Sequence, residues 1–115
     1  DYILQRMEAG DDIICGIFHN IDSAGHSYGF GESTEYTGAV INCDMYAYSI
    51  LQAVSEREQN YNEEWLVVFA NDHGGLGTGH GEQTLEERTT WIATNIPFDE
   101  KYYSQGYDGF NPNKQ

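Results

Sequence analysis

The sequence has little positive charge. Its 115 residues contain 5 Lys and Arg residues against 19 Asp and Glu residues, which gives a formal net charge of −14. A protein of this charge repels a phosphate backbone, so we expect no nucleic-acid polymer and no anionic membrane surface as a partner. No apolar run is long enough to span a bilayer, and no basic segment precedes an apolar one. The chain as given therefore predicts neither a membrane segment nor a signal peptide.

Cysteine is also scarce. The two cysteines, Cys15 and Cys43, allow at most one bridge, which is not a disulfide framework and does not reveal the redox compartment. Cys15 lies inside the apolar run "IICGIF", and Cys43 lies inside a helical pattern. Both are therefore predicted to be small buried hydrophobic residues.

The length suits one domain, and the pattern alternates between helix and strand. A short helix is predicted at the start of the chain with Gly10 as its stop, and a long amphipathic helix runs from Tyr36 to Val54 with Ser33 or Thr34 as N-cap. Buried strands are predicted within residues 12–20, 64–72 and 89–95, and residues 98–115 read as loop. Strands joined by crossover helices favour an α/β fold with a mostly parallel sheet and flanking helices.

Unusual polar residues follow two of the predicted strands. Asp22 and His26 form a D-x-x-x-H pair after the first strand. The second strand leads into "ANDHGGLGTGHG", which contains the adjacent pair Asp72 and His73 and, seven residues on, His80. In α/β sheets the functional crevice lies beyond the carboxyl ends of the strands. Carboxylate and imidazole are ligands suited to zinc, with manganese or iron as substitutes, so the sequence predicts a metal site.

Other interpretations of the same stretch remain open. "GHSYG" matches the G-x-S-x-G nucleophile elbow of serine hydrolases, with Ser27 as nucleophile. The flanking stretches "NIDSA" and "GFGES" have little strand or helix signal, whereas an elbow needs a strand before the serine and a helix after it. A noncatalytic zinc-binding module is a further alternative. His19 lies outside both ligand patterns, and we expect it to be a hydrogen-bonded structural histidine.

Several motifs in one order resemble a known family. "HNIDSAGHSYGFG", the amphipathic helix with Asp44, and "WLVVFANDHGGLGTGHGEQTLEERTTWIATN" together resemble the carboxy-terminal half of the catalytic domain in the alkaline phosphatase superfamily. The likeness is greatest to the branch of type I phosphodiesterases and nucleotide pyrophosphatases. It implies two divalent metal ions, zinc above all. Asp22, His26 and His80 would bind one ion, and Asp72 and His73 the other.

The resemblance also implies what the chain lacks. The superfamily's second metal needs a further aspartate at a strand end, and its serine or threonine nucleophile follows nearby; neither has a match here. We therefore expect residues 1–115 to be a fragment of one alkaline phosphatase-like catalytic domain without its nucleophile-bearing half, and we assign no catalytic residue. The implied function of the intact protein is metal-dependent hydrolysis of phosphoric diester or pyrophosphate bonds in a small-molecule phosphate ester. Phosphomonoesterase, phosphotransferase or sulfatase activity is the alternative within the superfamily. The fragment is expected to be inactive, and the family implies an extracellular or periplasmic location.

Overall fold

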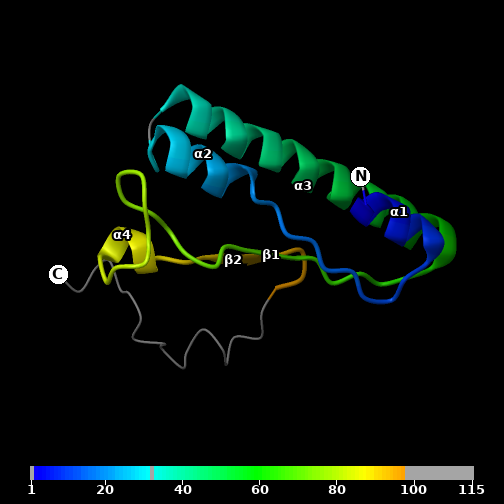
Figure 1. The fold of residues 1–115 in the computed structure, drawn as a ribbon. Helices are drawn as coiled ribbons and strands as arrows, with labels where there is room; N and C mark the ends of the chain where they lie inside the picture. The colour runs from blue at the N-terminus through cyan, green and yellow to red at the C-terminus, as the bar shows by residue number, and fades with distance from the viewer. Residues whose placement is uncertain (1, 32, 98–115) are drawn as a thin grey trace.

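A computed structural model describes residues 2–31 and 33–97 of the chain, so the loop expected at residues 98–115 lies outside the described residues. The elements are α1 (Tyr2–Ala9), α2 (Asn20–Tyr28), α3 (Thr34–Tyr61), β1 (Val68–Ala70), α4 (Leu85–Arg88) and β2 (Ile92–Thr94). Figure 1 shows α2 beside the beginning of the long helix α3 and α1 beside its end. Among the described residues, no helix is both long and apolar enough to cross a membrane.

The helix α3 confirms the predicted amphipathic helix. Its N-cap is Ser33, whose hydroxyl oxygen accepts a hydrogen bond from the backbone N–H of Tyr36 at 3.2 Å. The helix ends at Asn62, which adopts the left-handed conformation with φ 55°. Asparagine tolerates this conformation better than most residues, so it is a suitable residue to end a helix.

A small core lies between α1, α3 and β1. Met7, Ile50, Val54 and Val67 are buried together there. The helix α1 confirms the predicted first helix, and Gly10 ends it with φ 84°. Arg57 on α3 donates a hydrogen bond from Nη1 to the Met7 carbonyl at 2.9 Å. The end of α1 is thus held to α3 by both apolar packing and a charged donor.

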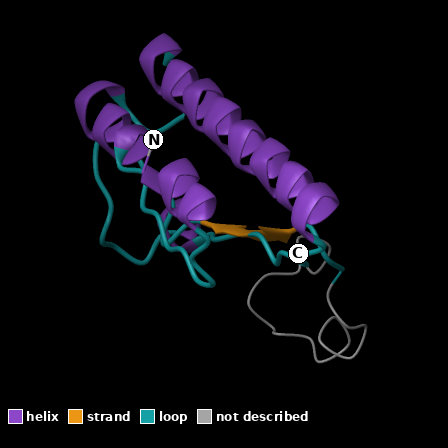
Figure 2. Ribbon diagram, turned by 90° about the vertical axis from the view of Figure 1, so that its right-hand side faces the viewer, coloured by secondary structure: helices purple, strands orange, loops and turns teal. Residues whose placement is uncertain are grey.

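The sheet differs from the predicted one. The strands β1 and β2 pair in antiparallel register, with Phe69 opposite Ala93, so the expected parallel sheet is not formed in the described residues. Figure 2 shows this strand pair lying below the long helix α3. The chain between the strands runs through the glycine-rich loop and α4 and returns alongside β1 in the opposite direction. The predicted strands at 64–72 and 89–95 are therefore present, but they are shorter and run antiparallel.

The first predicted strand is wrong. Residues 12–18 form no helix or strand, and α2 already begins at Asn20. Ile13 and Ile17 are 85% and 81% exposed, although the pattern predicted a strand buried on both faces. A strand needs a neighbour to pair with, and the described residues provide none for this segment. For the same reason Cys15 is exposed rather than buried, while Cys43 on α3 is half-buried.

Candidate metal centre

The helix α2 brings Asp22 and His26 together. They lie four residues apart, so both side chains project from the same helical face. The sequence pattern did not predict this helix, because "NIDSA" reads as loop. Gly29 ends α2, donating its N–H to the Gly25 carbonyl at 2.8 Å with φ 96°. The chain can then turn sharply toward the glycine-rich loop that follows β1.

A tight turn presents His80 to this helical face. Leu76 and Gly79 exchange backbone hydrogen bonds of 3.0 and 3.2 Å, and Gly77 between them has φ 59°. The Gly77 carbonyl accepts a hydrogen bond from the backbone N–H of Phe30 at 2.7 Å. Because the turn is anchored to the chain just after α2, His80 is held beside residues more than fifty positions earlier.

Three ligand atoms meet at this place. The Nε2 atoms of His26 and His80 are 3.1 Å apart, and Asp22 Oδ1 lies 3.3 Å from His80 Nε2 and 3.5 Å from His26 Nε2. Ligand atoms at tetrahedral corners around zinc, with bonds of about 2.0 Å, lie about 3.3 Å from one another. Asp22 Oδ1 is buried and accepts no hydrogen bond among the described residues. A buried carboxylate oxygen without a donor fits a metal ligand, because leaving it unpaired costs free energy.

The backbone selects which ring nitrogen of His26 faces the cluster. His26 Nδ1 lies 2.9 Å from the Thr78 carbonyl oxygen, and because a carbonyl can only accept, Nδ1 must carry the hydrogen. In the neutral ring this leaves the lone pair of Nε2 directed at Asp22 and His80. Metal-bound histidines are typically fixed in this way by a second hydrogen bond. The side chains of His26, Asp22 and His80 are 46%, 37% and 28% exposed, so the cluster is accessible to solvent.

Asp72 and His73 lie next to this cluster. The rings of His73 and His80 stack with centroids 3.7 Å apart, which brings the two predicted ligand sets together. His73 Nδ1 donates to the Gly74 carbonyl at 2.8 Å, so in the neutral ring Nε2 again carries the lone pair. Asp72 is 90% exposed, with Oδ1 3.7 Å from His73 Nε2. Among the described residues, only Asp22, His26 and His80 form a group of three possible ligands, so the second pair has no third partner there.

Short-range contacts of α4 hold the loop that contains these histidines. Thr84 and Glu87 form a capping box, and the carboxylate of Glu87 also accepts from the N–H of Glu82 at 3.2 Å. The Thr84 hydroxyl is the main reason that the pKa of the buried Glu87 carboxyl is lowered. The Glu87 carbonyl accepts from Gly74 N–H at 2.8 Å. The spacing of Thr84 and Glu87, a threonine followed three residues later by a glutamate, is the sequence signal for this box.

The other candidates lie outside the cluster. Ser27 lies in the last turn of α2, not at a turn from strand to helix, so the described residues form no nucleophile elbow. His19 is the exposed N-cap residue of α2 without a capping hydrogen bond, and the structural hydrogen bond expected for it is not seen in the described part.

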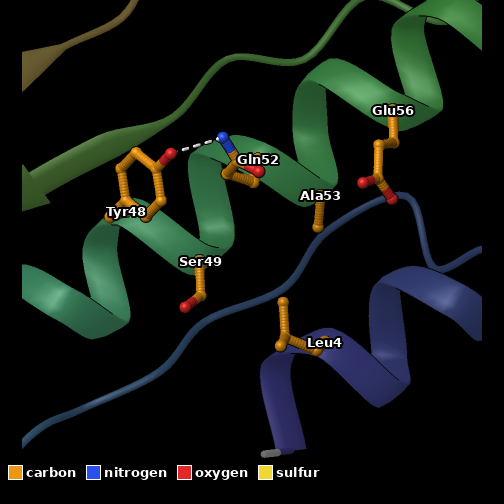
Figure 3. A pocket seen from close by; sticks show the side chains of 6 residues that line it. All are labelled: Leu4, Tyr48, Ser49, Gln52, Ala53 and Glu56. Carbon is orange, nitrogen blue, oxygen red and sulfur yellow. Dashed lines mark hydrogen bonds between the residues drawn. The ribbon is translucent and has the colours of Figure 1, made fainter.

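A hollow of about 320 Å³ lies between α1 and α3, where Gln52 donates to Tyr48 at 2.7 Å (Figure 3). None of the predicted ligands lines this hollow.

The ligand atoms and their accessibility to solvent indicate the class of site. Two imidazoles and one carboxylate with an accessible face are typical of a zinc site that takes part in catalysis. The comparison with protein families agrees with this class. The family model described as type I phosphodiesterase / nucleotide pyrophosphatase matches residues 4–112, and the chain belongs to that family. Its members are hydrolases of phosphate esters and are typically metal-dependent. No curated protein and no solved structure matches the chain significantly.

Proposed function

We propose that Asp22, His26 and His80 bind a zinc ion, and that the intact protein uses this site to hydrolyse phosphoric diester or pyrophosphate bonds. The observation that supports the proposal is the triangle of ligand atoms, whose three edges measure 3.1, 3.3 and 3.5 Å. Family membership supplies the reaction class. Asp72 and His73 are proposed as ligands of a second ion, because His73 stacks directly on His80.

Each residue of the proposed site would have a separate role. Asp22, His26 and His80 would hold the ion, and the Thr78 carbonyl would keep His26 in the tautomer that exposes Nε2. Bound divalent ions would supply positive charge for the nonbridging phosphate oxygens and the leaving oxygen. This charge matters especially here, because a chain with net charge −14 otherwise repels an anionic substrate.

We further propose that this chain alone does not turn over phosphate esters at a rate typical of the family. The superfamily nucleophile begins a helix after a strand-end aspartate, and no described serine or threonine has this setting. The Ser33 hydroxyl caps α3, the Thr84 hydroxyl donates to Glu87, and Ser27 lies inside α2. Groups that act as a unit in covalent catalysis lose most of the acceleration when one is missing.

The first test is a zinc titration by calorimetry. We expect the chain to bind one zinc ion measurably and a second one only weakly. The double variant Asp22→Ala/His26→Ala removes two of three ligands. Since losing a single outer partner of a metal ligand already costs roughly 10- to 100-fold in affinity, the loss here should exceed that range. Asp12→Ala/His19→Ala, an exposed Asp/His pair outside the cluster, is the matched control and should bind as the wild type does. Equal affinity in both double variants would contradict the assignment.

The second test is an activity assay of the purified chain. Nitrophenyl phosphodiester, nitrophenyl phosphate and nitrophenyl acetate are each assayed with zinc and with chelator. We expect no zinc-dependent turnover of either phosphate ester. Strong diester turnover with zinc would show that a nucleophile is present after all. Acetate turnover that resists chelator and disappears in Ser27→Ala would instead support the serine hydrolase.

A further inference from the structure

Phe30 contacts both histidines of the cluster. Its ring lies edge-on to His26, with centroids 5.5 Å apart and planes at 80°, and edge-on to His80, at 6.0 Å and 86°. Both contacts have the edge-to-face geometry that aromatic pairs prefer at separations of about 4.5–7 Å. One apolar ring therefore adjoins an imidazole from α2 and an imidazole from the glycine-rich loop.

Two glycines leave the space that this ring occupies. A Cβ atom added at Gly25 would lie 2.4 Å from Phe30 Cε1, and one added at Gly75 would lie 2.3 Å from Phe30 Cγ. Gly25 lies on α2 between Asp22 and His26, and Gly75 lies in the loop before His80. Any side chain at either position would push the ring out of place. The position of the Phe30 ring thus depends on glycine both on α2, at Gly25, and in the loop before His80, at Gly75.

The backbone and α3 fix the same ring. Phe30 N–H donates to the Gly77 carbonyl at 2.7 Å, inside the turn that leads to His80. On its α3 side the ring packs against Tyr36, with centroids 5.8 Å apart. Phe30 is consequently in contact with the helix that bears Asp22 and His26, with the loop that bears His80, and with the long helix.

We propose that Phe30 is a positioning residue of the metal centre: it sets the orientation of the His26 and His80 rings and so the separation of their Nε2 atoms. It offers no ligand atom and acts only through the two imidazoles. The inference rests on the proposed metal site and adds to it a requirement for an aromatic ring at this position, with glycine at 25 and 75.

The first experiment compares Phe30→Leu with Phe18→Leu. Phe18 also contacts an aromatic ring: it stacks on Tyr46 with centroids 5.8 Å apart. Among the described ring pairs, it contacts none of the proposed ligands. Zinc affinity is measured by competition with a chromophoric chelator, and ligand geometry by the visible absorption spectrum of bound Co²⁺. We expect Phe30→Leu to bind zinc about 10- to 100-fold more weakly and to shift the Co²⁺ spectrum, because outer-shell changes have effects of this size. Phe18→Leu should keep the wild-type spectrum and affinity.

The second experiment keeps Phe30 and moves its ring. Gly75→Ala should disturb the Co²⁺ spectrum as Phe30→Leu does, whereas Gly79→Ala, in the same loop with nothing within 4 Å of the added Cβ, should not. Neither glycine has a left-handed φ, so alanine suits both backbones. In the double variant Phe30→Ala/Gly75→Ala the Cγ and Cδ atoms that the added Cβ would meet are gone, so its affinity should match that of Phe30→Ala alone.

The outcomes separate this inference from the proposed function. If the wild type and Asp22→Ala/His26→Ala bind zinc equally, the metal site itself is wrong. If that pair differs as expected but Phe30→Leu and Gly75→Ala both bind Co²⁺ with the wild-type spectrum and affinity, the positioning role of Phe30 is overturned. Should Phe30→Leu not fold, as judged by circular dichroism, the comparison of Gly75→Ala with Gly79→Ala decides.

Discussion

At the scale of single residues, Asn71 joins the sheet to the candidate metal centre. Its Oδ1 accepts from the backbone N–H of Trp91 at 2.7 Å, next to the first residue of β2. Its Nδ2 donates to the His73 carbonyl at 2.8 Å. One side chain thereby extends the β1–β2 pairing and fixes the backbone of a proposed ligand. The sequence analysis missed this role, because an asparagine after a strand is also an ordinary loop residue.

Replacement of Asn71 tests this link. Asn71→Ala removes both of these hydrogen bonds and a longer one of 3.4 Å from Nδ2 to the Thr89 carbonyl. At about 0.5–1.5 kcal/mol for each of the two short bonds, we expect a loss of at least about 1–3 kcal/mol in the free energy of unfolding. Urea denaturation monitored by circular dichroism measures it. Asn60→Ala, at an exposed position on α3, is the control and should change stability little. A wild-type midpoint for Asn71→Ala would mean that the hydrogen bonds of this side chain add nothing to the stability of the fold.

At the scale of elements, Arg57 holds the end of α3 to two neighbouring segments. Its Nε and Nη2 donate to the carboxylate of Glu63 at 2.7 and 2.5 Å, and its Nη1 donates to Met7 of α1. The indole N–H of Trp65 donates to the same carboxylate at 2.7 Å. The Arg57 guanidinium, and secondarily the Trp65 indole, lower the pKa of the Glu63 carboxyl from 4.5 to about 2.

Because this pKa is lowered in the folded state, the free energy of unfolding should fall as the pH falls. The ionised carboxylate is favoured in the folded state, so its contribution is fully present above the ordinary pKa of 4.5 and is lost as the pH falls toward about 2. We expect Glu63→Gln to be less stable than the wild type at neutral pH, and the difference to shrink across that window. Urea denaturation at a series of pH values measures the difference. Glu64→Gln, at the exposed neighbouring position, is the control. A difference that is constant with pH would exclude the carboxylate as its source.

The sequence predicted some elements better than others, for a physical reason. The helices α1 and α3 were found because capping and periodicity are local, as Ser33 and Gly10 show. The segment 12–20 has the apolar pattern of a buried strand, yet its burial depends on neighbours that local sequence does not specify. The order and direction of β1 and β2 were not predictable either, since an apolar run looks alike in parallel and antiparallel sheets.

At the scale of the whole molecule, the apolar core is small. Among the described residues, four apolar side chains are buried, whereas many large ones, such as Ile13, Met45 and Trp91, are more than half exposed. Because the hydrophobic contribution is roughly proportional to the apolar area buried, a core of this size stabilises the fold only weakly. The candidate site joins parts of the chain that this core does not reach. The motifs and the resemblance predicted that Asp22, His26 and His80 lie together, but they did not predict the Gly77 turn and the Thr78 carbonyl that hold them there.

Zinc should therefore contribute a large share of the stability. The proposed ligands come from α2 and from the loop after β1, so an ion bound by all three would hold these parts together only in the folded state. A ligand that binds the folded state alone adds RT ln(1 + [L]/Kd), which is about 2.7 kcal/mol at a free concentration near 100 times Kd. For a domain of this size that amounts to a rise in Tm on the order of 10–20 °C. Thermal unfolding followed by circular dichroism, with zinc and then with chelator, measures the shift.

The variant His80→Ala makes this last prediction specific. It removes the one ligand of this ion that comes from the loop and leaves Asp22 and His26 on α2, so a zinc ion bound to these two would no longer join the two segments. We expect zinc to raise its Tm by a few degrees at most, whereas His19→Ala, which alters an exposed histidine outside the cluster, should show the full shift. If zinc raised the Tm of His80→Ala as much as that of the wild type, the ion would be bound elsewhere. Stabilisation would then say nothing about the convergence of α2 and the glycine-rich loop.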